Sequence, residues 1–125
     1  MSTSFKICER LRSFKYAFRG IWIMLKSQQN AWIHAAATIL VCCAGLYFHF
    51  TKSEWCWIVL AIVAVWTAEA FNTAFEFLAD KISKEYHPLI GKAKDVAAGA
   101  VLITAFGAAI VGILIIGPYL LNLLK

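Results

Sequence analysis

The chain has 125 residues, of which 62% are hydrophobic and only 15% are charged. A typical soluble domain is about 45–50% apolar and about 25% charged, and a single domain of this length has too much surface to bury so many apolar side chains. Disorder is excluded because it requires low hydrophobicity. With a mean hydropathy of +0.72, the composition predicts an integral membrane protein.

The first part of the chain, residues 5–29, predicts an amphipathic helix rather than a membrane span. Its apolar residues recur at alternating intervals of four and three positions, which places them along one side of a helix. They are Ile7, Leu11, Phe14, Phe18, Ile21 and Leu25. Basic residues surround this stripe, so we expect the helix to lie on the membrane surface. Anionic lipid headgroups explain the positive charge better than a nucleic acid does.

Three longer apolar stretches follow, at residues 31–50, 55–79 and 96–124. Each is long enough to cross a hydrocarbon core of about 30 Å as a helix. Only Thr51-Lys52-Ser53-Glu54 separates the first two, so these helices should form an antiparallel hairpin. The prediction is an all-α membrane protein with one amphipathic surface helix and three transmembrane helices, which form a single domain over residues 1–125.

The basic residues predict the orientation of these helices. Ten of the twelve Lys and Arg residues lie before the first span or within residues 80–95, and only Lys52 and Lys125 lie on the other side. The positive-inside rule makes the side with more basic residues cytoplasmic. We therefore expect a cytoplasmic N-terminus and a cytoplasmic loop at residues 80–95.

A stripe of polar residues interrupts the second span. Glu69, Asn72, Glu76 and Asp80 are three, four and four positions apart, which places them on one face of a helix. A carboxylate inside a bilayer costs on the order of 2.5–3.5 kcal/mol, so hydrogen bonding between helices is the less favoured explanation. Basic residues at the start of the third span suit a nucleotide phosphate with its divalent metal. The residues alone predict an acidic, metal-binding site that faces the cytoplasm.

The sequence around this stripe resembles the prokaryotic diacylglycerol kinase family, which includes the undecaprenol kinases. The resemblance covers nearly the whole chain. It rests on Glu69-x-x-Asn72-Thr73-Ala74-x-Glu76-x-x-x-Asp80, on Glu85-Tyr86-His87-Pro88-Leu89 and on the stretch from Ala93 to Leu102. It implies a homotrimeric lipid kinase of a bacterial cytoplasmic membrane, with ATP and Mg²⁺ as cofactors and no nucleic-acid partner. The acceptor would be the hydroxyl of a membrane lipid alcohol, either diacylglycerol or undecaprenol.

The resemblance also implies roles for individual residues. Glu69 matches the family's catalytic base, Asn72 its catalytic partner, and Glu76 a ligand of the metal. The implied nucleotide contacts are Tyr16, Glu76, Glu85, Tyr86, His87, Lys94 and Asp95. Where the family commonly has a second metal-binding Glu, this chain has Gln28. An amide oxygen can bind Mg²⁺ but brings no charge, so we expect weaker metal binding at that position.

Two other interpretations remain open. A proton- or cation-coupled transporter subunit would use Glu69 and Glu76 as its relay, but this hypothesis does not explain Lys94 and Asp95. An inactive member of the family would follow from Gln28. A further residue, His34, matches a common family position, and we expect it to form hydrogen bonds between helices rather than to contact substrate.

Overall fold

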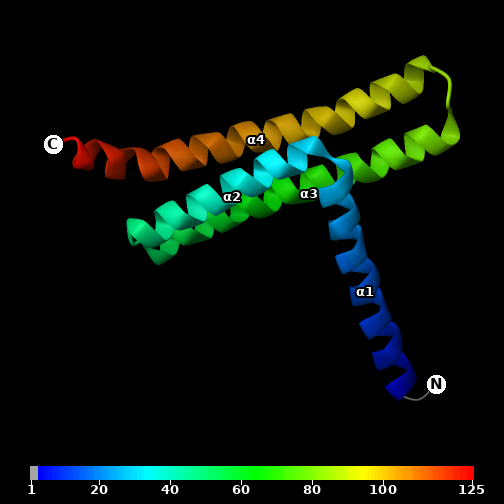
Figure 1. The fold of residues 1–125 in the computed structure, drawn as a ribbon, viewed down its shortest axis with the longest axis horizontal. Coiled ribbons are helices and arrows are strands. Elements are labelled where there is room, and N and C mark those ends of the chain that lie inside the picture. Colours follow the sequence, from blue (N-terminus) through cyan, green and yellow to red (C-terminus); the bar gives the residue numbers. More distant parts are fainter. Residues whose placement is uncertain (1–2) are drawn as a thin grey trace.

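The computed structural model describes residues 3–125, which form four helices connected by short segments. They are α1 (Thr3–Ser27), α2 (Gln29–Tyr47), α3 (Lys52–Ile82) and α4 (Pro88–Leu123). The helices α2, α3 and α4 lie alongside one another, whereas α1 projects away from them (Figure 1). Each of α2, α3 and α4 is long and apolar enough to cross a membrane. The predictions of an all-α chain and of three candidate membrane spans are confirmed.

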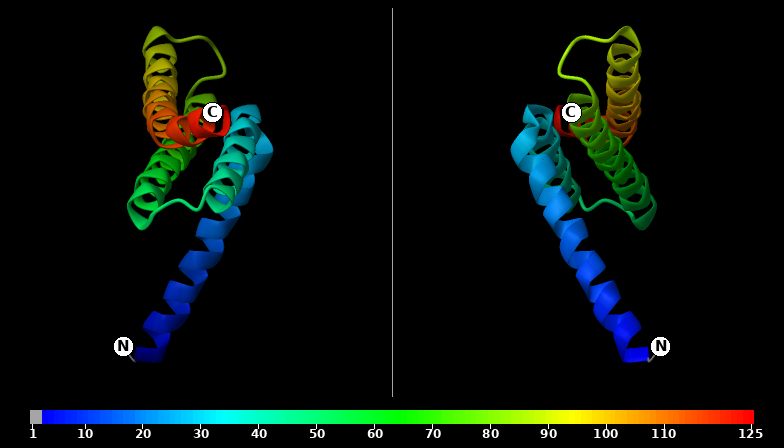
Figure 2. Two further views of the ribbon diagram at one scale, coloured as in Figure 1. Left: turned by 90° about the vertical axis from the view of Figure 1, so that its left-hand side faces the viewer. Right: turned by 90° about the vertical axis from the view of Figure 1, so that its right-hand side faces the viewer.

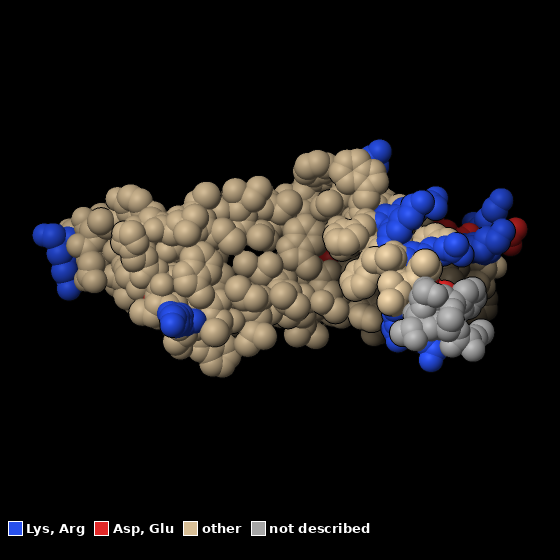
Figure 3. Space-filling view, turned by 90° about the horizontal axis from the view of Figure 1, so that it is seen from below, with Lys and Arg blue, Asp and Glu red and all other residues tan. Residues whose placement is uncertain are grey.

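Two of the helices are longer than a membrane span requires. With 31 residues in α3 and 36 in α4, they extend over about 46 Å and 54 Å at 1.5 Å per residue, against a hydrocarbon core of about 30 Å. Lys and Arg gather toward the end that holds α1 and the α3–α4 connection, while the middle of the same face is almost free of charge (Figure 3). The ends of α3 and α4 at this connection carry Lys81, Lys92 and Lys94. The excess length therefore carries the charged residues beyond the apolar part.

The chain bends sharply between α1 and α2. Gln28 has an extended backbone with φ −115° and ψ 120°, and Met24 and Ala31 are buried on either side of it. Beyond this bend α1 leaves the other helices, as the two side views show (Figure 2). Its apolar residues are accordingly exposed, Phe14 by 64% and Phe18 by 69%. These apolar residues of α1 therefore lie outside the core of this chain.

The connection between α2 and α3 lies earlier in the chain than expected, because Thr51 is the N-cap of α3 and Glu54 belongs to its first turn. The Glu54 N–H donates to Thr51 Oγ1 at 3.2 Å and the Thr51 N–H donates to Glu54 Oε2 at 2.8 Å. This is a capping box, whose S/T-x-x-E pattern is readable from sequence. The turn precedes it: His49 adopts φ 56° and the Phe50 N–H donates to the Gly45 carbonyl at 3.0 Å, as in a Schellman motif.

The loop expected at residues 80–95 is also shorter than predicted, since only residues 83–87 lie outside the helices. Pro88 occupies the first turn of α4, where its fixed φ and missing N–H are tolerated. The His87 side chain accepts a hydrogen bond from the Leu89 N–H at 3.3 Å and so caps the helix. The remaining boundaries fall within three residues of the expected ones.

An aromatic cluster joins the far end of α4 to the α2–α3 turn. The Tyr119 hydroxyl donates to Glu54 Oε2 at 2.8 Å. Phe48 and Phe50 stack on the Tyr119 ring with centroids 5.2 and 5.5 Å away, and Trp55 packs against Phe50. These contacts fix the three long helices relative to one another at the end opposite to the charged one.

We expect Gly45→Ala to lower the free energy of unfolding. A Cβ at Gly45 would lie 2.5 Å from the Trp55 ring, and overpacking of this kind costs about 1–3 kcal/mol. The control is Gly107→Ala, where a Cβ meets nothing within 4 Å; it should stabilise α4 by about 0.5–1 kcal/mol because Ala is the better helix former. Denaturant titration in detergent micelles measures both, and equal effects would contradict the close contact at Trp55.

Candidate functional site

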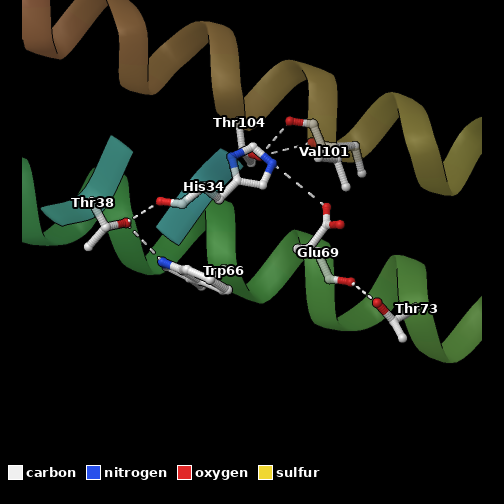
Figure 4. A network of polar contacts seen from close by, with 8 residues as sticks. His34, Thr38, Trp66, Glu69, Thr73, Val101 and Thr104 are labelled. Atoms are coloured by element: carbon white, nitrogen blue, oxygen red, sulfur yellow. Dashed lines mark hydrogen bonds and ion pairs between the residues drawn. The ribbon is translucent and has the colours of Figure 1, made fainter. Parts of the chain in front are cut away.

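Glu69 is fully buried between α2, α3 and α4. Within the described chain, neither of its carboxylate oxygens accepts a hydrogen bond from another group. The nearest basic atom is Nε2 of His34, 3.9 Å from Oε2 (Figure 4). A buried carboxylate without hydrogen bonds is costly, and natural proteins keep such exceptions at functional sites. This burial therefore points to a function for Glu69 rather than to a role in stability.

His34 is held in place through its backbone and by a neighbouring aromatic ring. Its carbonyl accepts a hydrogen bond from Thr38 Oγ1 at 2.7 Å, and Trp66 Nε1 donates to the same hydroxyl at 3.1 Å. The Trp66 ring meets the His34 ring edge-on, with centroids 6.5 Å apart. The separation of 3.9 Å between His34 and Glu69 is too long for a hydrogen bond. The bond that joins α2 to α3 here runs from Trp66 to Thr38 instead.

The polar stripe continues along α3 with Asn72 and Thr73, which are both buried. Thr73 Oγ1 donates to the carbonyl of Glu69 at 2.8 Å. Asn72 Oδ1 accepts no hydrogen bond from the described residues. Glu69 and Asn72 thus place three buried acceptor oxygens on one turn of α3, none of which accepts a hydrogen bond from residues 3–125.

Farther along the stripe, Glu76 and Asp80 meet Lys94 of α4. Lys94 Nζ lies 3.1 Å from Asp80 Oδ1 and 3.4 Å from Glu76 Oε2. Glu76 and Lys94 are half-buried, whereas Asp80 is exposed. Glu76 follows Glu69 by seven residues, which is about 10 Å along the helix. The structure therefore brings a cation and two carboxylates together close to the buried Glu69.

The other residues predicted to contact a nucleotide do not form one cluster with Lys94. Glu85, Tyr86 and His87 are exposed in the α3–α4 connection, with Tyr86 87% exposed. Asp95 is exposed on α4 next to Lys94. Tyr16 is 60% exposed on α1, the helix that projects from the others.

The carboxylates suit a metal that is shared with phosphate groups. Among the residues that the structure describes, no three His, Cys, Asp or Glu side chains lie together as a metal centre would require. Mg²⁺ in nucleotide sites is usually bound by one or two carboxylates plus the phosphates, and Glu76 and Asp80 fit that pattern. Gln28, at the α1–α2 bend, is half-buried and its side chain does not cap α2.

Two hollows lie between the helices that carry the site. The larger, of about 780 Å³, lies between α3 and α4 and is lined in part by Phe71, Asn72 and Lys92. The smaller, of about 250 Å³, lies between α2, α3 and α4 and begins at His34. Of the stripe residues, Asn72 lines the larger hollow, whereas Glu69 lines neither.

Comparison with known proteins identifies the family. A family model described as "Prokaryotic diacylglycerol kinase" matches residues 15–116. The chain belongs to this family. It is 40% identical to the undecaprenol kinase of Bacillus subtilis over 87% of this chain and 89% of that protein. It is 36% identical to a diacylglycerol kinase of Synechocystis over 91% of this chain and 66% of that protein.

A diacylglycerol kinase of Helicobacter pylori is 30% identical over 97% of both chains. Together with the membrane-length helices, these relatives make the chain a membrane-associated lipid kinase. They give no support to a transporter subunit.

Sequence reasoning missed several residues that shape the site. Thr38 and Trp66 are 28 positions apart, and neither stands out in an apolar helix. Asp80 belongs to the predicted stripe, but its ion pair with Lys94 depends on how α3 and α4 are aligned. No sequence signal specifies that alignment.

We expect Glu69→Leu to raise the free energy of unfolding. The substitution removes a buried carboxylate that accepts no hydrogen bond from the described residues. Leaving such a group unsatisfied costs about 1–3 kcal/mol of desolvation free energy. Glu76→Leu is the matched control on the same helix, because it removes a half-exposed carboxylate paired with Lys94 and should bring no such gain. Denaturant titration in micelles compares the two. A loss of stability in Glu69→Leu would mean that other groups compensate the charge.

Proposed function

We propose that this lipid kinase transfers the γ-phosphate of ATP to the hydroxyl of a membrane lipid alcohol, either diacylglycerol or undecaprenol. The observation that carries the proposal is the buried Glu69 carboxylate, which lies on the same helix face as the Glu76–Asp80–Lys94 cluster. The names of the relatives support both acceptors, since undecaprenol kinase and diacylglycerol kinase each occur among them.

In this mechanism Glu69 is the general base. Its carboxylate accepts the proton of the lipid hydroxyl while that oxygen attacks the γ-phosphorus, and the bond from that phosphorus to the β-phosphate oxygen breaks as ADP leaves. A base must have a free oxygen within hydrogen-bond reach of the proton that it removes, and neither oxygen of Glu69 accepts a hydrogen bond from the described residues. Asn72, one turn farther along, orients the same hydroxyl through its side-chain amide.

The charged end of α3 and α4 binds the nucleotide. Phosphoryl transfer depends mainly on positioning and on neutralising the phosphate charge. Lys94 supplies a positive charge that Glu76 and Asp80 hold in place. Glu76 and Gln28 would hold Mg²⁺ together with the phosphates, and the ion would supply further positive charge there. Further nucleotide contacts come from Tyr16, Glu85, Tyr86, His87 and Asp95.

The same proposal includes an assembly and an orientation. Residues 1–125 form one lipid-kinase domain, with the charged end on the cytoplasmic side of a bacterial cytoplasmic membrane. The exposed apolar side of α1 would lie on that membrane surface, and three copies would share their sites as a homotrimer. The projection of α1 from the other helices supports both arrangements, because it leaves its apolar side to a membrane or a second copy (Figure 2).

The direct test is a phosphorylation assay with purified protein in mixed micelles, using radiolabelled ATP and a panel of diacylglycerol, undecaprenol and no lipid. We expect label in at least one lipid. Glu69→Gln should reduce the rate by about 100-fold or more, because general-base catalysis typically contributes 10²–10⁴-fold. Glu54→Gln removes a carboxylate at the other end of α3 and should keep the activity. An absence of labelled lipid, or full activity in Glu69→Gln, would refute the proposal.

A second test concerns the metal. We expect Gln28→Glu to lower the Mg²⁺ concentration required for half-maximal activity, because it adds a negative charge to an amide position. Gln29→Glu adds the same charge to the neighbouring exposed residue and is the control. Direct titration with Mn²⁺, followed by electron paramagnetic resonance, measures affinity independently of turnover. If both substitutions have equal effects, Gln28 does not hold the ion.

A further inference from the structure

His34 of α2 is the basic side chain that stands closest to the buried carboxylate of α3. Its Nε2 lies 3.9 Å from Oε2 of Glu69, nearer than any other basic group that the structure describes (Figure 4). The Thr73 hydroxyl, one turn along α3, donates to the backbone carbonyl of Glu69 and so serves the helix rather than the carboxylate. The imidazole is therefore the group placed to donate a hydrogen bond to this carboxylate.

The gap between the two side chains is small enough to close. It exceeds the length of an N–H···O hydrogen bond by about 1 Å, and catalytic hydrogen bonds are often long in an empty site and shorten when substrates bind. His34 lines the smaller hollow, of about 250 Å³, so its ring has room to turn. Neither oxygen of Glu69 is held in its present position by a hydrogen bond from the described residues.

The backbone of His34 is fixed while its ring keeps this freedom. Thr38 Oγ1 donates to the His34 carbonyl at 2.7 Å and accepts from Trp66 Nε1 at 3.1 Å, which anchors α2 on α3. Trp66 precedes Glu69 by three residues, so the anchor lies within one turn of the carboxylate. These contacts keep His34 at the level of Glu69 in the membrane.

A hydrogen bond from His34 would support Glu69 as a base in two ways. A carboxylate without a donor in apolar surroundings tends to take up a proton, and it then cannot remove another from a hydroxyl. An N–H that donates to the carboxylate favours its charged form. A bond to Oε2 also fixes the direction of Oε1, as in sites where a third group orients the base.

We propose that His34 is a positioning residue for the phosphate transfer. With substrates bound, its Nε2–H donates to Oε2 of Glu69 and leaves Oε1 to accept the proton of the lipid hydroxyl. His34 touches no reacting atom and keeps its own proton throughout. This inference rests on the proposed function, because it takes Glu69 as the base.

The first test separates kcat from KM. We expect His34→Leu to lower kcat by about tenfold or more, because a hydrogen bond to a charged group is lost, with KM for ATP and lipid unchanged. His34→Gln keeps a side-chain N–H of similar reach and should retain kcat within about threefold of the wild type. The control is His49→Asn, which removes an exposed imidazole at the α2–α3 turn. Asn tolerates the φ of 56° found there, so this variant should keep full activity.

The decisive readout is a double-mutant cycle on kcat. In a Glu69→Gln background, His34→Leu should change kcat by less than about twofold, since no base is left to position. An equal loss in both backgrounds would mean that His34 only holds α2 against α3, and would overturn the proposal. So would a His34→Gln variant as impaired as His34→Leu, or a raised KM for lipid.

His34→Ala takes the place of His34→Leu in the cycle if denaturant titration shows that the Leu variant is unfolded. Failure of the proposed function looks different from failure of this inference. Full activity in Glu69→Gln, or an absence of labelled lipid with the wild-type protein, would refute the base itself, whereas additive losses would refute only the role of His34.

Discussion

A carboxylate that accepts no hydrogen bond from its own chain is expensive to bury, yet three helices enclose Glu69 completely. The energy that keeps it there comes from elsewhere in the bundle. The Trp66–Thr38 hydrogen bond joins α2 to α3 close to the carboxylate, and the aromatic cluster around Tyr119 joins all three helices at the far end. Both contacts lie on the side of Glu69 that faces the α2–α3 turn, and they hold together helices that the buried carboxylate by itself would favour separating.

Along α3 the surroundings of the acidic residues change in a regular way. Glu69 is buried, Glu76 is half-buried and Asp80 is exposed, so one helix face leads from an apolar interior to the aqueous end. The short α3–α4 connection places Lys94 beside the outer two carboxylates. In the proposed function, this single stripe provides the proton acceptor at one depth and the phosphate-binding cluster at another, one for each of the two unlike substrates.

The sequence predicts the helical spans and the acidic stripe because both depend on local patterns. Uninterrupted apolar runs specify membrane-length helices, and intervals of three and four positions place Glu69, Asn72 and Glu76 on one face. The expected loop at residues 80–95 was wrong, because the helices continue beyond the apolar runs and Pro88 already starts α4. The capping box at Thr51 was overlooked although its pattern is local.

Other features could not be predicted, because they depend on how the helices are aligned. The pairing of Trp66 with Thr38 joins residues 28 positions apart, and the contact of Lys94 with Asp80 depends on the geometry of residues 83–87. The smaller hollow likewise exists only where small residues of α4 face α2 and α3. Spacing within one helix reveals a shared face, but it says nothing about which residues of another helix lie opposite.

Because α3 and α4 are longer than a membrane span requires, we expect the rate of the reaction to depend on the thickness of the bilayer. A hydrocarbon core of about 30 Å covers only part of either helix, and a mismatch between helix and bilayer is relieved by tilt or by local deformation of the lipid. In a thicker bilayer the hydrocarbon core would extend farther along the stripe, toward Glu76 and Lys94. In a thinner bilayer water would reach closer to Glu69. The rate of phosphate transfer should therefore respond to the acyl-chain length of the surrounding lipids even when the acceptor stays the same.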